Sequence, residues 1–361
     1  MTSPAPPLHL RGVVLPEGEE RDLWVVAGRI TFEPVPGAET VLRGGWLLPG
    51  LVDAHCHVGI APDGPAGDLD AAAGQARADR DAGALLIRDC GSPVDTRPLL
   101  DVEDLPRIVR AGRHIARPKR YLRELGVEVE PDGLVDAVAG QAAYGGGWVK
   151  LVGDWIDRDA GDLAPLWPAD VLVAAVARAH GLGARVAVHV FGEEALPDLI
   201  AAGVDSVEHG TGLSPDQLGT LAARGTALVP TLINVDNFPS IAEGASKYPA
   251  YAAHMRRLFQ TSRERVRAAY EAGVRVVAGS DAGGGIGHGR VVDEIRALRD
   301  AGLPAEAALA AGSWDARAWL GLPGIAEGAP ADLVAYAADP RADLSTLAAP
   351  ARTVLRGRPI R

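Results

Sequence analysis

Two histidines that could bind a metal ion stand two positions apart at the end of an apolar run. The run is Leu47-Leu-Pro-Gly-Leu-Val-Asp-Ala-His-Cys-His57. In a buried parallel strand the side chains alternate between two faces, so His55 and His57 point to one face and Cys56 to the other. Two imidazoles on a rigid strand end are suited to a metal ion, although such a pair also occurs on strands that bind nothing. The prediction of a metal site therefore depends on whether other strand ends supply further ligands.

Several more polar side chains fall inside or directly after other apolar segments. Taken alone, a histidine at a strand end is more often a core residue with satisfied hydrogen bonds, and an aspartate before glycines can simply begin a turn. A lysine within an apolar strand is harder to explain, because a buried ammonium needs a partner, neutralisation or a chemical modification. Together with the first pair, the set favours one metal site. Its additional members are Lys150, His189, His209 and Asp281.

The elements that must position these residues alternate between apolar strands and alanine-rich helices from residue 47 to about residue 320. Eight strand–helix units in a row are typical of an α/β protein with a (β/α)8 TIM barrel, whose functional side chains lie at the carboxyl ends of the strands. The predicted strands are Leu47–His55, Ala84–Asp89, Arg107–Ala111, Trp148–Val152, Arg185–Val190, Ser206–His209, Ala227–Leu232 and Arg275–Ser280. The predicted helices are Asp68–Ala82, Leu134–Tyr144, Pro168–His180, Glu193–Ala202, Pro215–Arg224, Ala250–Ala272 and Pro304–Leu320.

Short strands between Gly and Pro turns occur at both ends of the chain. They are predicted at Leu8–Val14, Leu23–Val26, Arg29–Phe32, Thr40–Leu42, Asp332–Ala337 and Arg352–Leu355. Because they flank the barrel in sequence, we predict a small β-sandwich domain built from both termini, residues 1–46 plus 328–361, beside a barrel of residues 47–327. The stretch 237–255 is longer than an ordinary barrel loop and is a candidate lid or dimer surface. A dimer surface there would make the protein a homo-oligomer.

The composition and charge of the chain disfavour some classes of binding partner. The chain has 361 residues, is 47% hydrophobic and carries a net charge of −11, so it repels nucleic acid and acidic membrane surfaces. No apolar stretch approaches the roughly 20 residues of a membrane span. The start lacks a basic segment followed by an apolar one, which predicts a cytoplasmic protein. Cys56 and Cys90 are predicted to be reduced and buried. The expected partner is a small-molecule substrate.

The joint motif set resembles that of the amidohydrolase superfamily, specifically its binuclear branch with a carboxylated lysine. It is similar to the imidazolonepropionase-like and Xaa-Pro dipeptidase-like group, and the resemblance runs from about residue 8 to the C-terminus. The matching segments are Leu48-Pro-Gly-Leu-Val-Asp-Ala-His-Cys-His57, Trp148-Val-Lys150, His189, Ser206-Val-Glu-His-Gly210, Gly279-Ser-Asp-Ala282 and Gly328-Ala-Pro-Ala-Asp-Leu-Val334.

The resemblance implies two divalent metal ions and a role for each matched residue. The implied ligands are His55, His57 and Asp281 for one ion and His189 and His209 for the other. Lys150, as N6-carboxylysine, would bridge both ions, which converts a costly buried cation into an anionic oxygen ligand. The ions would share a hydroxide nucleophile, and Asp281 would move its proton to the leaving group. Imidazoles with oxygen ligands favour zinc, with manganese, cobalt and iron as alternatives.

At three positions or segments this chain differs from its relatives, so their substrates cannot simply be assigned to it. The deaminase branch has a glutamate three positions after the strand-five histidine, where this chain has Gly192. Dipeptidase-like members often have a second histidine at the position of Phe191. Their loop after the third strand is often rich in glycine and histidine, whereas here residues 112–121 carry a basic cluster. The substrate is therefore the least transferable part of the resemblance.

The basic loop is the main candidate for substrate recognition, because an arginine can grip a carboxylate with two hydrogen bonds. A solvated surface loop explains the same charges. Other candidates lie after strands four, seven and eight. The candidate substrate-binding residues are His114, Arg117, Tyr121, Asp154, Trp155, Asn234 and His288. By strand alternation Glu208 faces away from His209 and supports the site.

We predict a hydrolase that cleaves a C–N bond of a small amide, such as a dipeptide or an N-acyl amino acid. A cyclic amidase, lactonase or phosphotriesterase with the same metal pair is an alternative. An inactive scaffold is an alternative of another class, although inactive relatives usually lack metal ligands and none is missing from this sequence.

Overall fold

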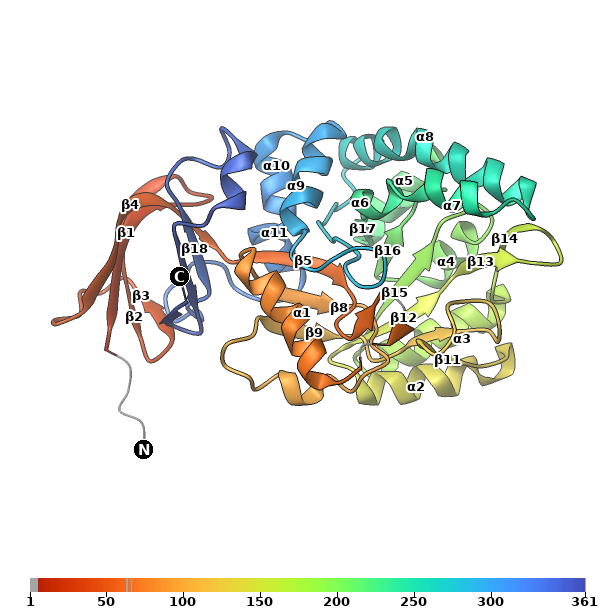
Figure 1. Cartoon of the computed structure of the whole chain (residues 1–361), viewed down its shortest axis with the longest axis horizontal. Coiled ribbons are helices and arrows are strands. Elements are labelled where there is room, and N and C mark those ends of the chain that lie inside the picture. Colours follow the sequence, from red (N-terminus) through yellow and green to blue (C-terminus); the bar gives the residue numbers. More distant parts are fainter. Residues whose placement is uncertain (1–5, 63, 66, 361) are drawn as a thin grey trace.

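The computed structural model of the chain describes residues 6–62, 64–65 and 67–360. A β-sheet lies at one end of the molecule, and an α/β region with its central strands and surrounding helices makes up the rest (Figure 1). In the part that the structure describes, no helix is both long and apolar enough to cross a membrane.

The sheet at the end of the molecule contains strands from both ends of the sequence. Its order is β20-β19-β18-β4-β1-β2-β3. The central strand β4 is paired in parallel with β1 and antiparallel with β18, so it joins the two ends of the sequence. The two-layer sandwich stays a prediction. The bounds are β1 Leu8–Val14, β2 Glu19–Val26, β3 Arg29–Thr31, β4 Glu39–Pro49, β18 Leu333–Tyr336, β19 Arg352–Leu355 and β20 Arg358–Pro359.

The predicted strand Leu47–His55 is two strands, which corrects the sequence analysis. Its first residues complete β4 in the terminal sheet, and β5 covers Leu51–Cys56. Gly50 lies between them, and only glycine fits there because a Cβ atom would lie 2.5 Å from Cβ of Leu85. The amide of Gly50 donates to the carbonyl of Asp332 instead of to a neighbouring barrel strand.

The remaining strands form two main parallel groups, β5-β8-β9 and β11-β10-β12-β15-β16-β17. The segment Arg275–Ser280, predicted as the eighth strand, is not a regular strand. It nevertheless bonds to both groups: Val277 donates to Leu228 of β17, and Ala54 of β5 donates to Ala278. The α/β class is confirmed. Closure of the strands into a barrel stays a prediction, which these hydrogen bonds support. The bounds are β8 Ala84–Asp89, β9 Arg107–Arg110, β10 His114–Ala116, β11 Gly126–Glu128, β12 Trp148–Val152, β15 Arg185–Val190, β16 Ser206–His209 and β17 Ala227–Val229.

Most predicted helices are present, with two differences. The predicted helix Pro304–Leu320 is divided into α10 and α11, because Gly312 packs against Ile295 and the Ser313 hydroxyl donates to the carbonyl of Pro49. Helices α6, α7 and α9 were not predicted. The bounds are α1 Leu69–Asp81, α2 Leu134–Tyr144, α3 Ala169–Gly181, α4 Leu196–Ala202, α5 Pro215–Arg224, α6 Leu232–Val235, α7 Phe238–Gly244, α8 Pro249–Glu271, α9 Val291–Asp300, α10 Ala305–Ala311 and α11 Trp314–Trp319.

Smaller elements lie in the loops. Two hairpins are formed by β6 Ile60–Ala61 with β7 Gly64–Pro65 and by β13 Asp154–Asp157 with β14 Asp162–Pro165. Short 3-10 helices span Arg97–Leu99, Pro131–Gly133 and Leu344–Ala348. The stretch 237–255 becomes α7 and the beginning of α8, beside β14.

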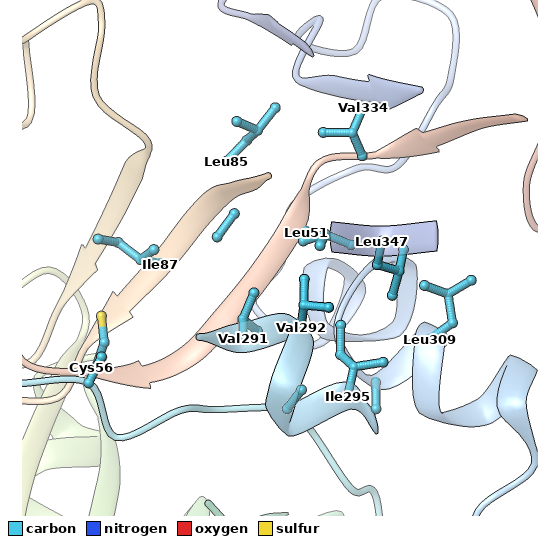
Figure 2. Packing of buried hydrophobic residues seen from close by; sticks show 14 of the residues in the cluster. Leu51, Cys56, Leu85, Ile87, Val291, Val292, Ile295, Leu309, Val334 and Leu347 are labelled. Carbon is cyan, nitrogen blue, oxygen red and sulfur yellow. The ribbon is translucent and has the colours of Figure 1, made fainter. Parts of the chain in front are cut away.

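One apolar core connects the terminal sheet to the α/β region. Leu51 and Leu85 from the central strands lie in the same buried cluster as Ile295 of α9 and Val334 of β18 (Figure 2). Burying a side chain of this size stabilises the folded state by about 1.5–3 kcal/mol. The terminal sheet is thus packed against the strand that carries the first two histidines.

Candidate metal centre and cavity

The six residues predicted as metal ligands meet at the carboxyl ends of the strands. Nε2 of His55 lies 3.2 Å from Nε2 of His57 and 3.2 Å from Oδ1 of Asp281. Nδ1 of His189 lies 2.9 Å from Nε2 of His209. The two groups adjoin, since His55, His209 and Asp281 present ligand atoms within 4.8 Å of one another. The structure therefore gathers the predicted set around one point.

The first two histidines present lone pairs to each other. Nδ1 of His55 lies 2.7 Å from a carboxylate oxygen of Glu208, and Nδ1 of His57 donates to the carbonyl of Gly91 at 3.0 Å. Both partners can only accept, so a proton belongs on each Nδ1 atom, and the neutral form of each ring has its lone pair at Nε2. Two lone pairs at 3.2 Å repel each other. A cation that both nitrogens coordinate satisfies them, so the donor set fits a metal ion.

The second pair of histidines is buried and neutral. Burial lowers the pKa of His209 to about 3 and the pKa of His189 well below its ordinary value. Neutral imidazole is the form that binds metal ions. Nδ1 of His209 is hydrogen-bonded to the hydroxyl of Thr231 at 2.7 Å, so its Nε2 is the atom that faces His189 and the other ligand residues. Nε2 of His189 lies 4.0 Å from Asp154, and its Nδ1 faces His209.

Lys150 points toward the imidazoles rather than toward the helices. Its Nζ atom lies 3.3 Å from Nε2 of His55, and the residue is 1% exposed. In the part of the chain that the structure describes, no carboxylate forms an ion pair with it. A carboxylated lysine at this position would place anionic oxygens between the imidazole pairs.

The backbone is strained where three of the strand ends meet the site. His209, Asp281 and the β-branched Thr231 have φ angles of 67°, 56° and 47°, in the left-handed region. Such conformations cost about 1–3 kcal/mol each and persist where the surroundings enforce them. Here they turn the histidine and the carboxylate toward the common centre.

Asp281 is held as an anion by its neighbours. Its Oδ1 lies 3.0 Å from Nε2 of His57, and its Oδ2 accepts a hydrogen bond from Nδ2 of Asn234 at 2.7 Å. Burial alone would raise the pKa of Asp281, whereas positive charge at the Nε2 atoms of His55 and His57, brought by a proton or a cation, lowers it well below its usual range. An oriented carboxylate of this kind can accept a proton and pass it on.

An arginine that sequence reasoning missed supports the first histidine. Arg88 of β8 is fully buried and donates two hydrogen bonds to Glu208 at 2.8 and 2.9 Å. Its guanidinium also stacks on Trp148 at 4.5 Å. Burial would raise the pKa of Glu208, yet Arg88 and His55 hold it well below its ordinary value. A charged residue inside the apolar segment 84–89 was the available sequence signal.

A second missed support fixes the first and last strand positions to each other. Asp53 accepts hydrogen bonds from the hydroxyl and the amide of Ser280, and from the amide of His55 at 3.2 Å. Burial raises the pKa of Asp53 to about 7. The carboxylate thereby ties the strand that carries His55 to the residue before Asp281.

A cavity of about 500 Å³ opens beside the six residues. Three of the predicted substrate-binding residues line it: Tyr121, Trp155 and Asn234. The rings of Tyr121 and Trp155 are in edge contact, with centroids 4.8 Å apart, and both approach His189. Aromatic side chains thus border the ligand cluster directly.

The other four predicted substrate-binding residues are not among the described residues that line this cavity. His114 is buried and stacks on His57, with both ring nitrogens lacking a hydrogen-bond partner among the described residues. Arg117 is paired with Glu130 at 3.1 Å. The two further cases are Asp154, which accepts from the amides of Phe191 and Gly192, and His288, which is paired with Asp79 at 2.8 Å.

An α/β domain that gathers four imidazoles, an amine and a carboxylate beside a cavity has a donor set for metal ions, and the family comparison assigns the chain to the hydrolases. The chain belongs to the amidohydrolase family: the model of the amidohydrolase family matches residues 161–360. It is similar to an uncharacterized protein of Mycobacterium tuberculosis (strain ATCC 25618 / H37Rv), with 59% identity over 352 residues, 97% of this chain and 95% of that protein.

The fold is similar to those of solved prolidase-like structures. A Xaa-Pro dipeptidase with bound methionine superimposes with a TM-score of 0.83 at 23% identity, covering 98% of this chain and 99% of that one. A putative prolidase from Bifidobacterium longum gives a TM-score of 0.85 at 22% identity, covering 99% and 95%. The observed fold is therefore the amidohydrolase fold that the motif set predicted.

Proposed function

We propose that this amidohydrolase binds two divalent metal ions, preferably zinc, and hydrolyses the amide bond of a small molecule. His55, His57 and Asp281 would hold one ion. His189 and His209 would hold the other, with Lys150 as N6-carboxylysine between them. The observation that carries the proposal is the pair of Nε2 lone pairs 3.2 Å apart on His55 and His57, each fixed by an acceptor on the far side of its ring.

The chain's own residues supply the proton transfers. Bound divalent ions would activate a water molecule and polarise the scissile carbonyl. Oδ1 of Asp281 would take the proton of the attacking water and return it to the leaving nitrogen, which an amine needs before it departs. Asn234 would hold the other carboxylate oxygen, so that Asp281 keeps its orientation during both transfers.

The named relatives support a small amide substrate. The Xaa-Pro dipeptidase and the prolidase favour a dipeptide, and an N-acyl amino acid presents the same kind of bond. The cavity of about 500 Å³ is of the size that encloses small molecules.

The test is metal analysis combined with a substrate panel. We expect about two zinc ions per chain after reconstitution and loss of turnover after chelation, restored by zinc. The panel contains dipeptides, N-acyl amines, N-acyl amino acids, lactones and aryl phosphotriesters. Less than one bound ion per chain would contradict the metal centre, and turnover confined to lactones or phosphotriesters would contradict the amide assignment.

A further inference from the structure

The basic loop of residues 112–121 does not supply a cation to the cavity. Arg117 is paired with Glu130 at 3.1 Å, and Arg120 with Asp157 at 2.9 Å. Arg113 donates to backbone carbonyls of the segment that follows. These guanidinium groups have protein partners, and none of the three is among the described residues that line the cavity.

The wall of the cavity is aromatic and aliphatic. Phe191 packs against His189 and His209, with ring centroids 4.3 and 4.8 Å apart, and Trp155 stacks on Phe191 at 6.3 Å. Aliphatic side chains continue this surface outward to the rim, where Leu122 and Ile241 are 51% and 38% exposed. Apolar side chains exposed together at a cavity mouth indicate an apolar ligand.

The charges of the cavity are confined to the ligand cluster. Among the described lining residues, Lys150 is the one lysine or arginine and Asp281 the one acid. Apart from the imidazoles, the remaining polar side chains are the uncharged Asn234, Asn237, Ser240, Tyr121 and Tyr251. A carboxylate placed against the aromatic wall would lose its water and gain no cationic partner, which is costly.

We propose that the substrate group seated against this wall is an uncharged aromatic or branched aliphatic group, so that the enzyme prefers neutral N-acyl amines to substrates with a free carboxylate. The inference rests on the proposed amide hydrolysis and, among the substrates named for it, ranks neutral N-acyl amines above dipeptides and N-acyl amino acids. Trp155 and Phe191 would hold the apolar group, and Asn237 and Ser240 would bond to uncharged polar atoms.

The test uses two compounds that differ by one carboxylate, N-acetylphenethylamine and N-acetylphenylalanine. With the zinc-reconstituted enzyme we expect kcat/KM to favour the neutral compound by about tenfold or more, because the second compound buries an unpaired charge. Equilibrium binding, followed by calorimetry, should show the same preference in Kd.

Charge-introducing variants give the matched comparison. Leu122→Arg, and separately Ile241→Arg, should raise kcat/KM for N-acetylphenylalanine relative to the neutral compound by about tenfold. Leu182→Arg changes an exposed leucine at the end of α3, outside the cavity, and should leave the ratio unchanged.

The outcomes separate the two proposals. If neither compound is cleaved, amide hydrolysis fails for this substrate class, and the Kd ratio still decides the preference. If N-acetylphenylalanine is cleaved or bound as well as its neutral counterpart by the unmodified enzyme, the inference is overturned while amide hydrolysis stands.

Discussion

Oε2 of Glu208 lies 2.7 Å from Nδ1 of His55, at the far side of the ring from the proposed metal. The same carboxylate accepts two hydrogen bonds from a fully buried arginine, Arg88. The ring of His55 is thus oriented by a charge that is itself fixed by a second charge, and its Nε2 faces the other ligands.

The first prediction removes this charge with Glu208→Gln. The amide can donate as well as accept, so it no longer enforces a proton at Nδ1 of His55, and Arg88 loses its counter-charge. Zinc affinity should fall by about 10–100-fold, measured by competition with a chelator. Glu243→Gln, at an exposed position of α7, is the control. Equal zinc affinity in both variants would show that Glu208 does not orient the ligand.

The second prediction concerns Lys150. Lys150→Ala should lower kcat by about a hundredfold or more, because the bridging ligand is lost. A short carboxylic acid added to the assay should restore part of the activity by entering the vacated space. Lys247→Ala, exposed after α7, should behave like the unmodified enzyme. A carbonyl signal from labelled bicarbonate, present in the unmodified protein and absent from Lys150→Ala, would report the carbamate; its absence from both would count against carboxylation.

The third prediction tests proton transfer. Asp281→Asn keeps the size of the side chain but removes its basic oxygen, so kcat should fall by about 10²–10⁴-fold. KM should change less, because the cavity wall is intact. Asp159→Asn, an exposed aspartate between β13 and β14, is the control for a lost negative charge. An Asp281→Asn enzyme with kcat within about twofold of normal would remove this residue from the chemistry.

The fourth prediction concerns pH and stability. His254 of α8 lies 2.8 Å from Glu193 and 2.9 Å from Asp162 of the β13–β14 hairpin, and its hydrogen bond with Glu193 raises the pKa of His254. A raised folded pKa gives stability that is fully present below the unfolded value near 6.5 and is lost as the pH rises through the folded pKa.

His254→Gln should therefore cost about 1 kcal/mol of unfolding free energy at about pH 6 and much less at about pH 9. Urea unfolding at the two pH values measures the difference. Glu193 remains ionised at both, because its pKa is lowered to about 2 by the hydrogen bond with His254. A loss of equal size at both pH values would show packing rather than charge.

The sequence was sufficient to predict that the residues of the proposed chemistry lie at strand ends. Strand ends can be recognised because the apolar runs stop at a polar residue. His189 and His209 are such cases. Their convergence follows from the parallel order of the strands. Arg88 could not be assigned a role in this way, since its partner Glu208 is 120 positions away and no local pattern pairs them.

Loop residues were the least predictable. Arg117 and His288 were chosen for their types, but Glu130 and Asp79 hold them elsewhere, and neither contact follows from strand periodicity. The division at Gly50 was also missed, because an apolar run reads the same in one strand or in two. The close approach of Leu85 that forbids a side chain at Gly50 exists only in three dimensions.

Gly50 also has a consequence for handling the protein. A single residue separates the sheet that joins the two chain ends from the strand that ends at His55 and Cys56. A truncation meant to trim the amino-terminal strands would cut into the scaffold of the proposed reaction centre, since β4 continues almost directly into β5. Fusion partners should therefore be attached outside residues 8–359, where the terminal sheet stays whole.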